Sequence, residues 1–166
     1  AVTGVWELLK VAAQAMAHGP FDLAARLELV GLMVDKWHTR GIEVGSISLS
    51  EAMGWNAPHT TRETLTALRD TCPEIERYHL HLHNSRGSTI ASYYEALQRG
   101  VTGFDTSIGG MGGCPYCGNG RAAGHVPTED FVDLCHEMGI ATGYDLDKLI
   151  QAAWIAEEVV GHPLWG

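Results

Sequence analysis

The sequence predicts an α/β fold in which short strands alternate with amphipathic helices. Apolar, β-like runs occupy residues 43–51, 77–84 and 103–108, and segments with a helical spacing of apolar residues lie between and after them. Of the 166 residues, 45% are hydrophobic, which is enough to build a core. The sequence shows no low-complexity segment or proline-rich linker, so we expect a single domain over residues 1–166. Strict alternation implies parallel strands that are joined by right-handed crossovers and covered by helices.

A closed (β/α)₈ barrel typically needs about 250 residues, more than this sequence contains. We therefore expect an incomplete barrel, a partial TIM barrel, with an open three-stranded sheet as the alternative. The first helical segment, residues 5–18, meets the next one across Gly19-Pro20 without a strand between them. This adjacency indicates either a direct connection of two helices or a place where residues are absent from the numbering.

The second helix is predicted over residues 22–40, because apolar side chains recur at helical spacing until Gly41. A strand over residues 43–51 follows it. Thr60 and Glu63 then have the spacing of a capping box, and they predict the start of another helix.

Residues 77–84 form the second predicted strand, and the helix after it ends at Gly100. A third strand over residues 103–108 leads directly into a lid loop over residues 109–127, whose glycine-rich part runs from Gly109 to Gly124 and is called the glycine-rich loop below. Glycine imposes little restriction on the backbone, so this loop has the composition of a lid that folds over a ligand.

Two further helices complete the prediction. Thr128 is expected to cap the first of them, and Glu129 and Asp130 in its first turn match the positive end of the helix dipole. The last helix is predicted over residues 146–160, where apolar residues again recur at helical spacing.

The charge and the cysteines narrow the class of protein. The formal charge is −9, from 20 acidic and 11 basic residues without a basic run, which argues against a nucleic-acid or an anionic-membrane surface. An anionic ligand would need a local basic group, such as Arg86 or Arg121. Four cysteines, with no signal peptide and no long apolar run, favour a reducing, cytoplasmic setting. Cys72 and Cys135 lie in helical patterns and are expected to be small buried residues.

Alternating histidines mark the second strand. Because residues two apart in a strand face the same way, His79, His81 and His83 share one side. His81 and His83 lie near the carboxyl end of the strand, where α/β barrels place their active sites, and together they are candidate metal ligands. A histidine-rich surface strand is the alternative. His79 lies deeper, and we expect it to be a hydrogen-bonded core histidine, or one that supports the metal ligands from outside, rather than a ligand.

Two carboxylates accompany these histidines. Glu51 ends the first strand and is expected to project toward the same rim, where it could orient a metal-bound water, balance charge or transfer a proton. A solvated loop carboxylate is the alternative. Asp105 lies in the short third strand, and we expect a structural role for it, as a partner of an imidazole or of backbone amides.

The glycine-rich loop carries candidates of its own. Cys114 is a plausible acid, base or polar clamp. Cys114 and Cys117 also resemble half of a zinc knuckle or a dithiol redox pair, although zinc would need further ligands. His125 follows the loop and could return to the metal as a third ligand, with a surface histidine as the alternative.

Three ordered strings carry a resemblance to a known family. They are His81-Leu82-His83-Asn84, the run from Thr106 through Gly112-Gly113-Cys114-Pro115-Tyr116, and Pro127-Thr128-Glu129-Asp130. In this order they resemble the 3-hydroxy-3-methylglutaryl-CoA (HMG-CoA) lyase branch of the DRE-TIM metallolyases. The similarity extends from about Asp22 to Gly161.

The resemblance implies the C-terminal part of a (β/α)₈ barrel that uses Mg²⁺ or Mn²⁺. Transferred position by position, it makes His81 and His83 metal ligands and Cys114 a catalytic thiol on the lid. Glu51 takes the place of an acidic residue that closes the sixth strand, and it is the second candidate catalytic residue. The candidate substrate-binding residues are Asn84, Arg86, Gly112, Gly113 and Arg121.

Three departures from the family pattern matter. The family usually offers an asparagine ligand after a shorter glycine loop, where this sequence has His125, and an imidazole ligand favours softer metals such as Mn²⁺, Zn²⁺ or Fe²⁺. Glutamate replaces the usual aspartate at Glu51. The Asp-Arg-Glu-like motif of the first strand is absent from these residues.

The implied activity is metal-dependent cleavage of a carbon–carbon bond in HMG-CoA or a related 3-hydroxyacyl-CoA thioester or hydroxy acid. We expect a homodimer or a higher homo-oligomer. One alternative is a condensing acyl transferase similar to citramalate or isopropylmalate synthase, or a hydroxy-keto-acid aldolase. A second is a zinc-binding structural module built on Cys114, Cys117 and His125, and a third is an inactive half-barrel.

Overall fold

The structure, a computed structural model, describes residues 22–51, 54–113 and 123–166. The predicted helix over residues 5–18 and the connection at Gly19-Pro20 lie outside these residues, as do Cys114, Cys117 and Arg121. No helix in the described part of the chain is long and apolar enough to cross a membrane.

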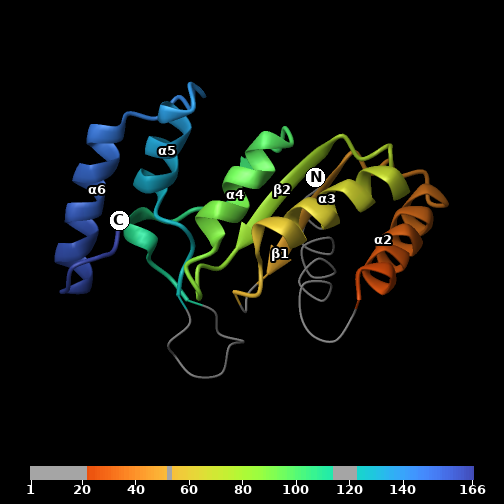
Figure 1. The fold of residues 1–166 in the computed structure, drawn as a ribbon, viewed down its shortest axis with the longest axis horizontal. Coiled ribbons are helices and arrows are strands. Elements are labelled where there is room, and N and C mark those ends of the chain that lie inside the picture. Colours follow the sequence, from red (N-terminus) through yellow and green to blue (C-terminus); the bar gives the residue numbers. More distant parts are fainter. Residues whose placement is uncertain (1–21, 52–53, 114–122) are drawn as a thin grey trace.

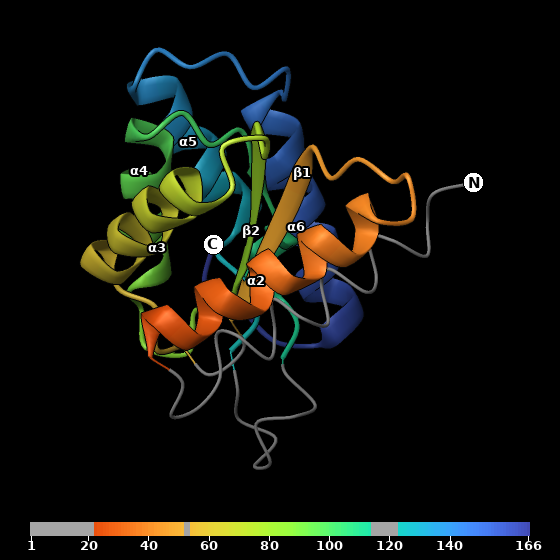
Figure 2. The same cartoon turned by 90° about the vertical axis from the view of Figure 1, so that its right-hand side faces the viewer.

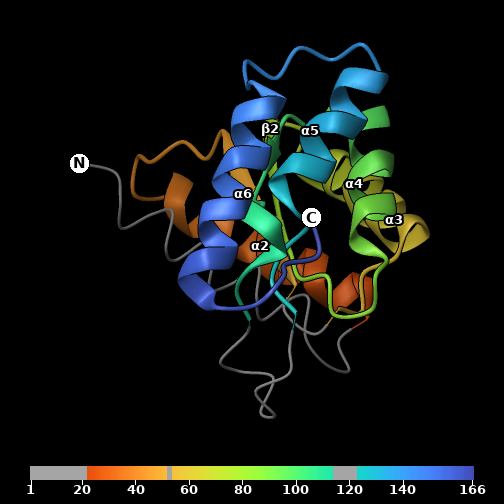
Figure 3. The ribbon, with the colours of Figure 1, turned by 90° about the vertical axis from the view of Figure 1, so that its left-hand side faces the viewer.

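Three parallel strands form a sheet, as the sequence predicts, and the structure gives their order as β1 (Ser46–Glu51), β2 (Arg77–Leu82) and β3 (Gly103–Phe104). Helices α3 and α4 cover one face of the sheet, α2 lies toward one end of the molecule, and α5 and α6 lie toward the other (Figure 1). Views from the two ends show α2 (Figure 2) and α6 (Figure 3) at the front. The elements are α2 (Leu23–His38), β1 (Ser46–Glu51), α3 (Pro58–Thr71), β2 (Arg77–Leu82), α4 (Thr89–Gln98), β3 (Gly103–Phe104), the 3₁₀ turn η1 (Ile108–Gly110), α5 (Thr128–Glu137) and α6 (Leu146–Val160).

Strand β2 has two chemically different faces. Tyr78, Leu80 and Leu82 are buried on the face that packs into the core. His79 and His81 alternate with them, and the strand register sets these histidines beside polar neighbours, Ser48 and Ser50 of β1. The predicted alternation of histidine and apolar residues is therefore confirmed.

The core gathers around Tyr93 of α4, whose side chain is fully buried. Its ring lies 5.0 Å from that of Phe104 and 5.3 Å from that of Phe131, measured between centroids. Its hydroxyl donates a 2.8 Å hydrogen bond to the carbonyl of Asp105. Burial raises the pKa of Tyr93 well above its usual value, so the phenol stays protonated and keeps this bond. Tyr93 therefore joins α4 to the end of β3.

Both predicted threonine caps are wrong in detail. Helix α3 begins two residues before Thr60, at Pro58, a residue that suits the first helical position because the amide it lacks would have no partner there. Thr60 instead accepts a 3.0 Å hydrogen bond from the amide of Ala57. Thr128 is the first helical residue of α5, and its hydroxyl donates to Thr106.

The strands are shorter than predicted, and β3 is shortened most. After Phe104 only the amide of Asp105 continues the ladder, donating to Leu80. Ser107 then pairs with the segment that follows the glycine-rich loop: its amide donates to Val126, and its carbonyl accepts from Thr128. The chain has left β2 by this point, so an unbroken strand over 103–108 does not form.

Candidate metal centre

Three histidines gather at the carboxyl end of β2. His81 lies in the strand, His83 follows it, and His125 comes from the chain beyond the glycine-rich loop. One ring nitrogen of each lies within 4.8 Å of those of the other two. Ligand atoms bound about 2.1 Å from one ion lie about 3 to 4 Å apart, so small ring movements would complete a site.

In all three rings the same atom, Nδ1, makes a hydrogen bond to the protein. The Nδ1 atom of His81 lies 2.5 Å from Oδ2 of Asp105. The Nδ1 atoms of His83 and His125 lie 3.1 Å and 2.9 Å from backbone carbonyl oxygens. These partners accept, so each Nδ1 donates, and in the neutral ring this tautomer leaves Nε2 with the lone pair. A lone pair on a neutral imidazole is what a metal ion binds.

The segment that carries His125 is tied to the end of β2. The amide of Asn84 donates to the carbonyl of Gly124 at 2.9 Å, and Nδ1 of His125 donates to the carbonyl of Leu82. Burial, together with the neighbouring His81 and His83, lowers the pKa of His125 below its usual value. His125 is therefore held as a neutral imidazole beside the other two, and it is not the surface histidine that was the alternative.

Asp105 bridges two histidines of β2. Its Oδ1 lies 2.8 Å from Nε2 of His79, and its Oδ2 bonds to His81. Burial alone would raise the pKa of Asp105, but the hydrogen bonds from both rings outweigh it and hold that pKa far below the usual range. The predictions that Asp105 partners an imidazole and that His79 is hydrogen-bonded are confirmed, although about a third of each side chain is exposed.

Glu51 lies among buried polar groups. The register pairs it with Leu82, on the core-facing side of the sheet rather than beside His81, and its exposed fraction is 5%. Its Oε2 accepts a 2.8 Å hydrogen bond from the side chain of Asn56. The alternative of a solvated carboxylate is therefore wrong, while a catalytic role for Glu51 stays a prediction.

Asn56 is a residue that the sequence analysis missed. Its side-chain amide donates to Glu51, to the carbonyl of His83 at 3.3 Å and to Thr89 at 3.2 Å. Its side-chain oxygen accepts from Ser92 at 3.0 Å. Asn56 thus links the ends of β1 and β2 to the start of α4 by hydrogen bonds. No local pattern marks it, because its partners come from three separate segments.

The root of the glycine-rich loop is fixed by a buried carboxylate. The amide of Gly109 donates a 2.7 Å hydrogen bond to Oε1 of Glu129, whose exposed fraction is 4%. Gly109 has a φ of +60°, and Leu164 fills the space that a Cβ would occupy there.

The two buried cysteines, Cys72 and Cys135, lie in the core as expected.

Among the described substrate-binding candidates, Asn84 follows His83 directly in the chain. The side-chain oxygen of Asn84 accepts a 3.3 Å hydrogen bond from the amide of Thr89, at the start of α4. Arg86, Gly112 and Gly113 are exposed. Their roles toward a substrate stay predictions, as do those of Cys114 and Arg121 outside the described residues.

Comparison with known proteins agrees with this arrangement. The sequence matches the HMGL-like family over residues 8–155. It is 34% identical over 145 residues to the (R)-citramalyl-CoA lyase of Chloroflexus aurantiacus, covering 87% of this chain and 44% of the relative. It is 39% identical over 121 residues to a hydroxymethylglutaryl-CoA lyase of Bacillus subtilis, covering 73% of this chain and 40% of the relative. The chain thus spans less than half the length of these two relatives.

Solved structures show the same similarity. An HMG-CoA lyase from Acinetobacter baumannii, in complex with coenzyme A and 3-methylmalate, matches with a TM-score of 0.70 and 32% identity over 84% of this chain and 44% of that one. The hydroxymethylglutaryl-CoA lyase from Pseudomonas aeruginosa matches with a TM-score of 0.72 and 26% identity over 99% of this chain and 57% of that one. These lyases are TIM barrels, so the three parallel strands are part of such a barrel, as predicted.

Proposed function

The chain belongs to the HMGL-like family, and on this basis we propose that it carries the metal site of an acyl-CoA carbon–carbon lyase. The observation that supports this most directly is the convergence of three imidazoles, from His81, His83 and His125, each held by a hydrogen bond at Nδ1, at the end of a barrel strand. Active sites of TIM barrels lie at this end of the strands.

The proposed reaction is cleavage of a 3-hydroxyacyl-CoA thioester. His81, His83 and His125 would hold a divalent metal, which would polarise the hydroxyl oxygen of the substrate so that a base can accept its proton. The bond between C2 and C3 then breaks, C3 becomes a carbonyl carbon, and the electron pair passes to the thioester as an enolate. We propose that the Cys114 thiol supplies the proton that the departing carbon requires, and that Glu51 assists in handling protons or charge.

The donor set and the relatives support a proposal for the metal and the substrate. Three imidazoles favour Mn²⁺, Zn²⁺ or Fe²⁺ over Mg²⁺. We propose HMG-CoA, citramalyl-CoA or a related thioester as substrate, bound with the help of Asn84, Arg86, Gly112, Gly113 and Arg121. The cytoplasmic location and a homodimeric or higher homo-oligomeric state also stay predictions.

The zinc-module alternative would require His125 to join Cys114 and Cys117. In the structure, the His125 ring lies 4.4 Å and 4.5 Å from the rings of His81 and His83, measured between centroids. This placement favours a site made of histidines.

A panel of 3-hydroxyacyl-CoA thioesters tests the proposal. The chain should cleave at least one of them with Mn²⁺ or Zn²⁺, and chelation should abolish turnover. His83→Ala should lose metal binding and cleavage, while His59→Ala, on the exposed surface of α3, should keep both. Metal binding without any cleavage would refute the lyase assignment and leave the metal site in place.

The condensing alternative is tested at the loop. Cys114→Ala should abolish cleavage without changing the dissociation constant of the metal, because the thiol is not a proposed ligand. Unchanged turnover of the variant would favour a condensing enzyme instead.

A further inference from the structure

We propose that His79 is a positioning residue for the metal ligand His81 and acts through Asp105. The inference rests on the proposed metal site. It assigns His79 a role that differs from that of its neighbours, since the group of converging histidines among the described residues does not include it.

The geometry is a chain of hydrogen bonds across one face of the sheet. The Nε2 atom of His79 lies 2.8 Å from Oδ1 of Asp105, and Nδ1 of His81 lies 2.5 Å from Oδ2. One carboxylate therefore uses one oxygen for each ring. With Oδ1 held by His79, rotation of the carboxylate is restricted and Oδ2 stays directed at His81.

The main chain of Asp105 is fixed independently. Its amide donates a 2.9 Å hydrogen bond to Leu80, and its carbonyl accepts one from the buried hydroxyl of Tyr93. The remaining freedom of Asp105 is therefore in its side chain, and His79 restrains that freedom. About a third of the Asp105 side chain is exposed, so water could otherwise compete for its carboxylate.

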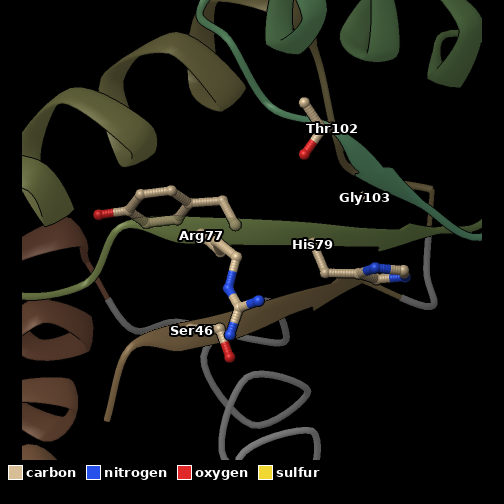
Figure 4. Close-up of a pocket in the computed structure, with 6 residues that line it drawn as sticks. Ser46, Arg77, His79, Thr102 and Gly103 are labelled. Carbon is tan, nitrogen blue, oxygen red and sulfur yellow. The ribbon is translucent and has the colours of Figure 1, made fainter.

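Gly103 makes the contact possible. It pairs with His79 in the register of β2 and β3, and a Cβ placed on it would lie 2.6 Å from Nδ1 of the His79 ring. Real Cβ atoms do not approach a ring nitrogen this closely, so any larger residue at 103 would displace the imidazole. Figure 4 shows His79 projecting from β2 beside Gly103, and both residues line a pocket together with Ser46 and Arg77.

The consequence concerns the direction of the metal-binding lone pair. The bond from Nδ1 of His81 to Asp105 sets the tautomer and the plane of the ring, and so determines where Nε2 points. Loss of such an outer partner typically weakens metal binding by about 10- to 100-fold. We expect that range for Asp105→Asn and the lower end of it, about 10-fold, for loss of His79.

Four variants separate positioning from general stability. His79→Ala removes the donor, and His79→Gln keeps an amide that can donate to Asp105. Gly103→Ala keeps both side chains but occupies the space of the ring. His59→Ala, on the exposed surface of α3, is the matched control.

The readouts are the dissociation constant for Mn²⁺ or Zn²⁺ by calorimetry and the ¹⁵N spectrum of the histidine rings in metal-free protein. His79→Ala and Gly103→Ala should each weaken metal binding about 10-fold and weaken or remove the Nδ1–H signal of His81. His79→Gln and His59→Ala should resemble the unmodified protein. In the Asp105→Asn background, His79→Ala should have no further effect, because the Asp105 carboxylate through which His79 acts is already absent.

Unchanged metal binding and an unchanged His81 spectrum in His79→Ala would overturn the inference, as would an equal loss in the Asp105→Asn background. The underlying metal site is tested separately by His81→Ala. If that variant binds metal normally, the proposed site is wrong, whereas the spectra of the metal-free protein still decide whether His79 orients His81.

Discussion

The carbonyl of Leu82 accepts a 2.9 Å hydrogen bond from the ring of His125, which fixes the chain beyond the glycine-rich loop to the end of β2. One ring nitrogen of His125 lies within 4.8 Å of a ring nitrogen of His81 and of His83. A single side chain thus completes the cluster of three histidines and anchors the end of the loop.

Replacement of His125 should alter metal binding in a way that depends on the new side chain. His125→Ala should weaken Mn²⁺ or Zn²⁺ binding at least 10-fold, because it removes a whole ligand rather than an outer partner. His125→Asn should retain binding but shift the preference toward Mg²⁺, since an amide oxygen is a harder ligand than an imidazole. Competition titrations with the metals measure both effects. Identical affinities in all three proteins would show that His125 is not a ligand.

The carboxylate of Glu129 should stabilise the root of the glycine-rich loop. Glu129→Ala leaves the buried amide of Gly109 without its acceptor and should lower the free energy of unfolding by about 1 to 3 kcal/mol. Glu129→Gln retains an acceptor oxygen and should cost less. Urea unfolding of the two variants compares them, and equal losses would mean that the hydrogen bond is not the source of the effect.

Gly109 and Leu164 should be coupled energetically. A left-handed backbone at a non-glycine residue costs about 1 to 2 kcal/mol, so Gly109→Ala should be destabilising even without a clash. Leu164 adds to this cost, because its side chain occupies the space that the new methyl group needs. The Gly109→Ala loss should therefore be smaller in a Leu164→Ala background. A double-mutant cycle of unfolding free energies measures the difference, and strict additivity would contradict the packing.

Glu95 should make the stability of the protein depend on pH. Hydrogen bonds from Arg99 and Arg62, at 2.9 Å and 3.0 Å, together with their positive charge, hold the pKa of Glu95 below its usual value of 4.5. A lowered folded-state pKa means that the stabilisation is present above the unfolded pKa and is lost as the pH falls through the folded one. The melting temperature of Glu95→Gln should therefore lie below that of the unmodified protein at pH 7 and approach it in acid.

Salt provides the control for this prediction. These ion pairs lie near the surface, so high salt should screen them and reduce the difference in melting temperature at pH 7. A difference that is independent of both pH and salt would indicate a packing effect instead.

Much of the fold could be predicted because it depends on short-range repeats. Helix α2 follows the predicted apolar spacing closely, and Asp22 caps it by accepting from the amide of Ala25. The alternation of β2 placed His79 and His81 on one face without any tertiary information. The third strand was predicted too long because Ser107 pairs with a segment across the loop, and no local property of residues 103–108 shows where that partner lies.

The sequence by itself determined the α/β class, the parallel strands, the shared side of the histidines and the family resemblance, because periodicity and ordered motifs are properties of neighbouring residues. Only the tertiary structure decided that His125 joins His81, that Asp105 links His79 to His81, and that Asn56 connects three segments. Each of these contacts joins residues that are far apart in the chain. Whether their atoms come within hydrogen-bond distance depends on how the strands, loops and helices pack, which local sequence patterns do not encode.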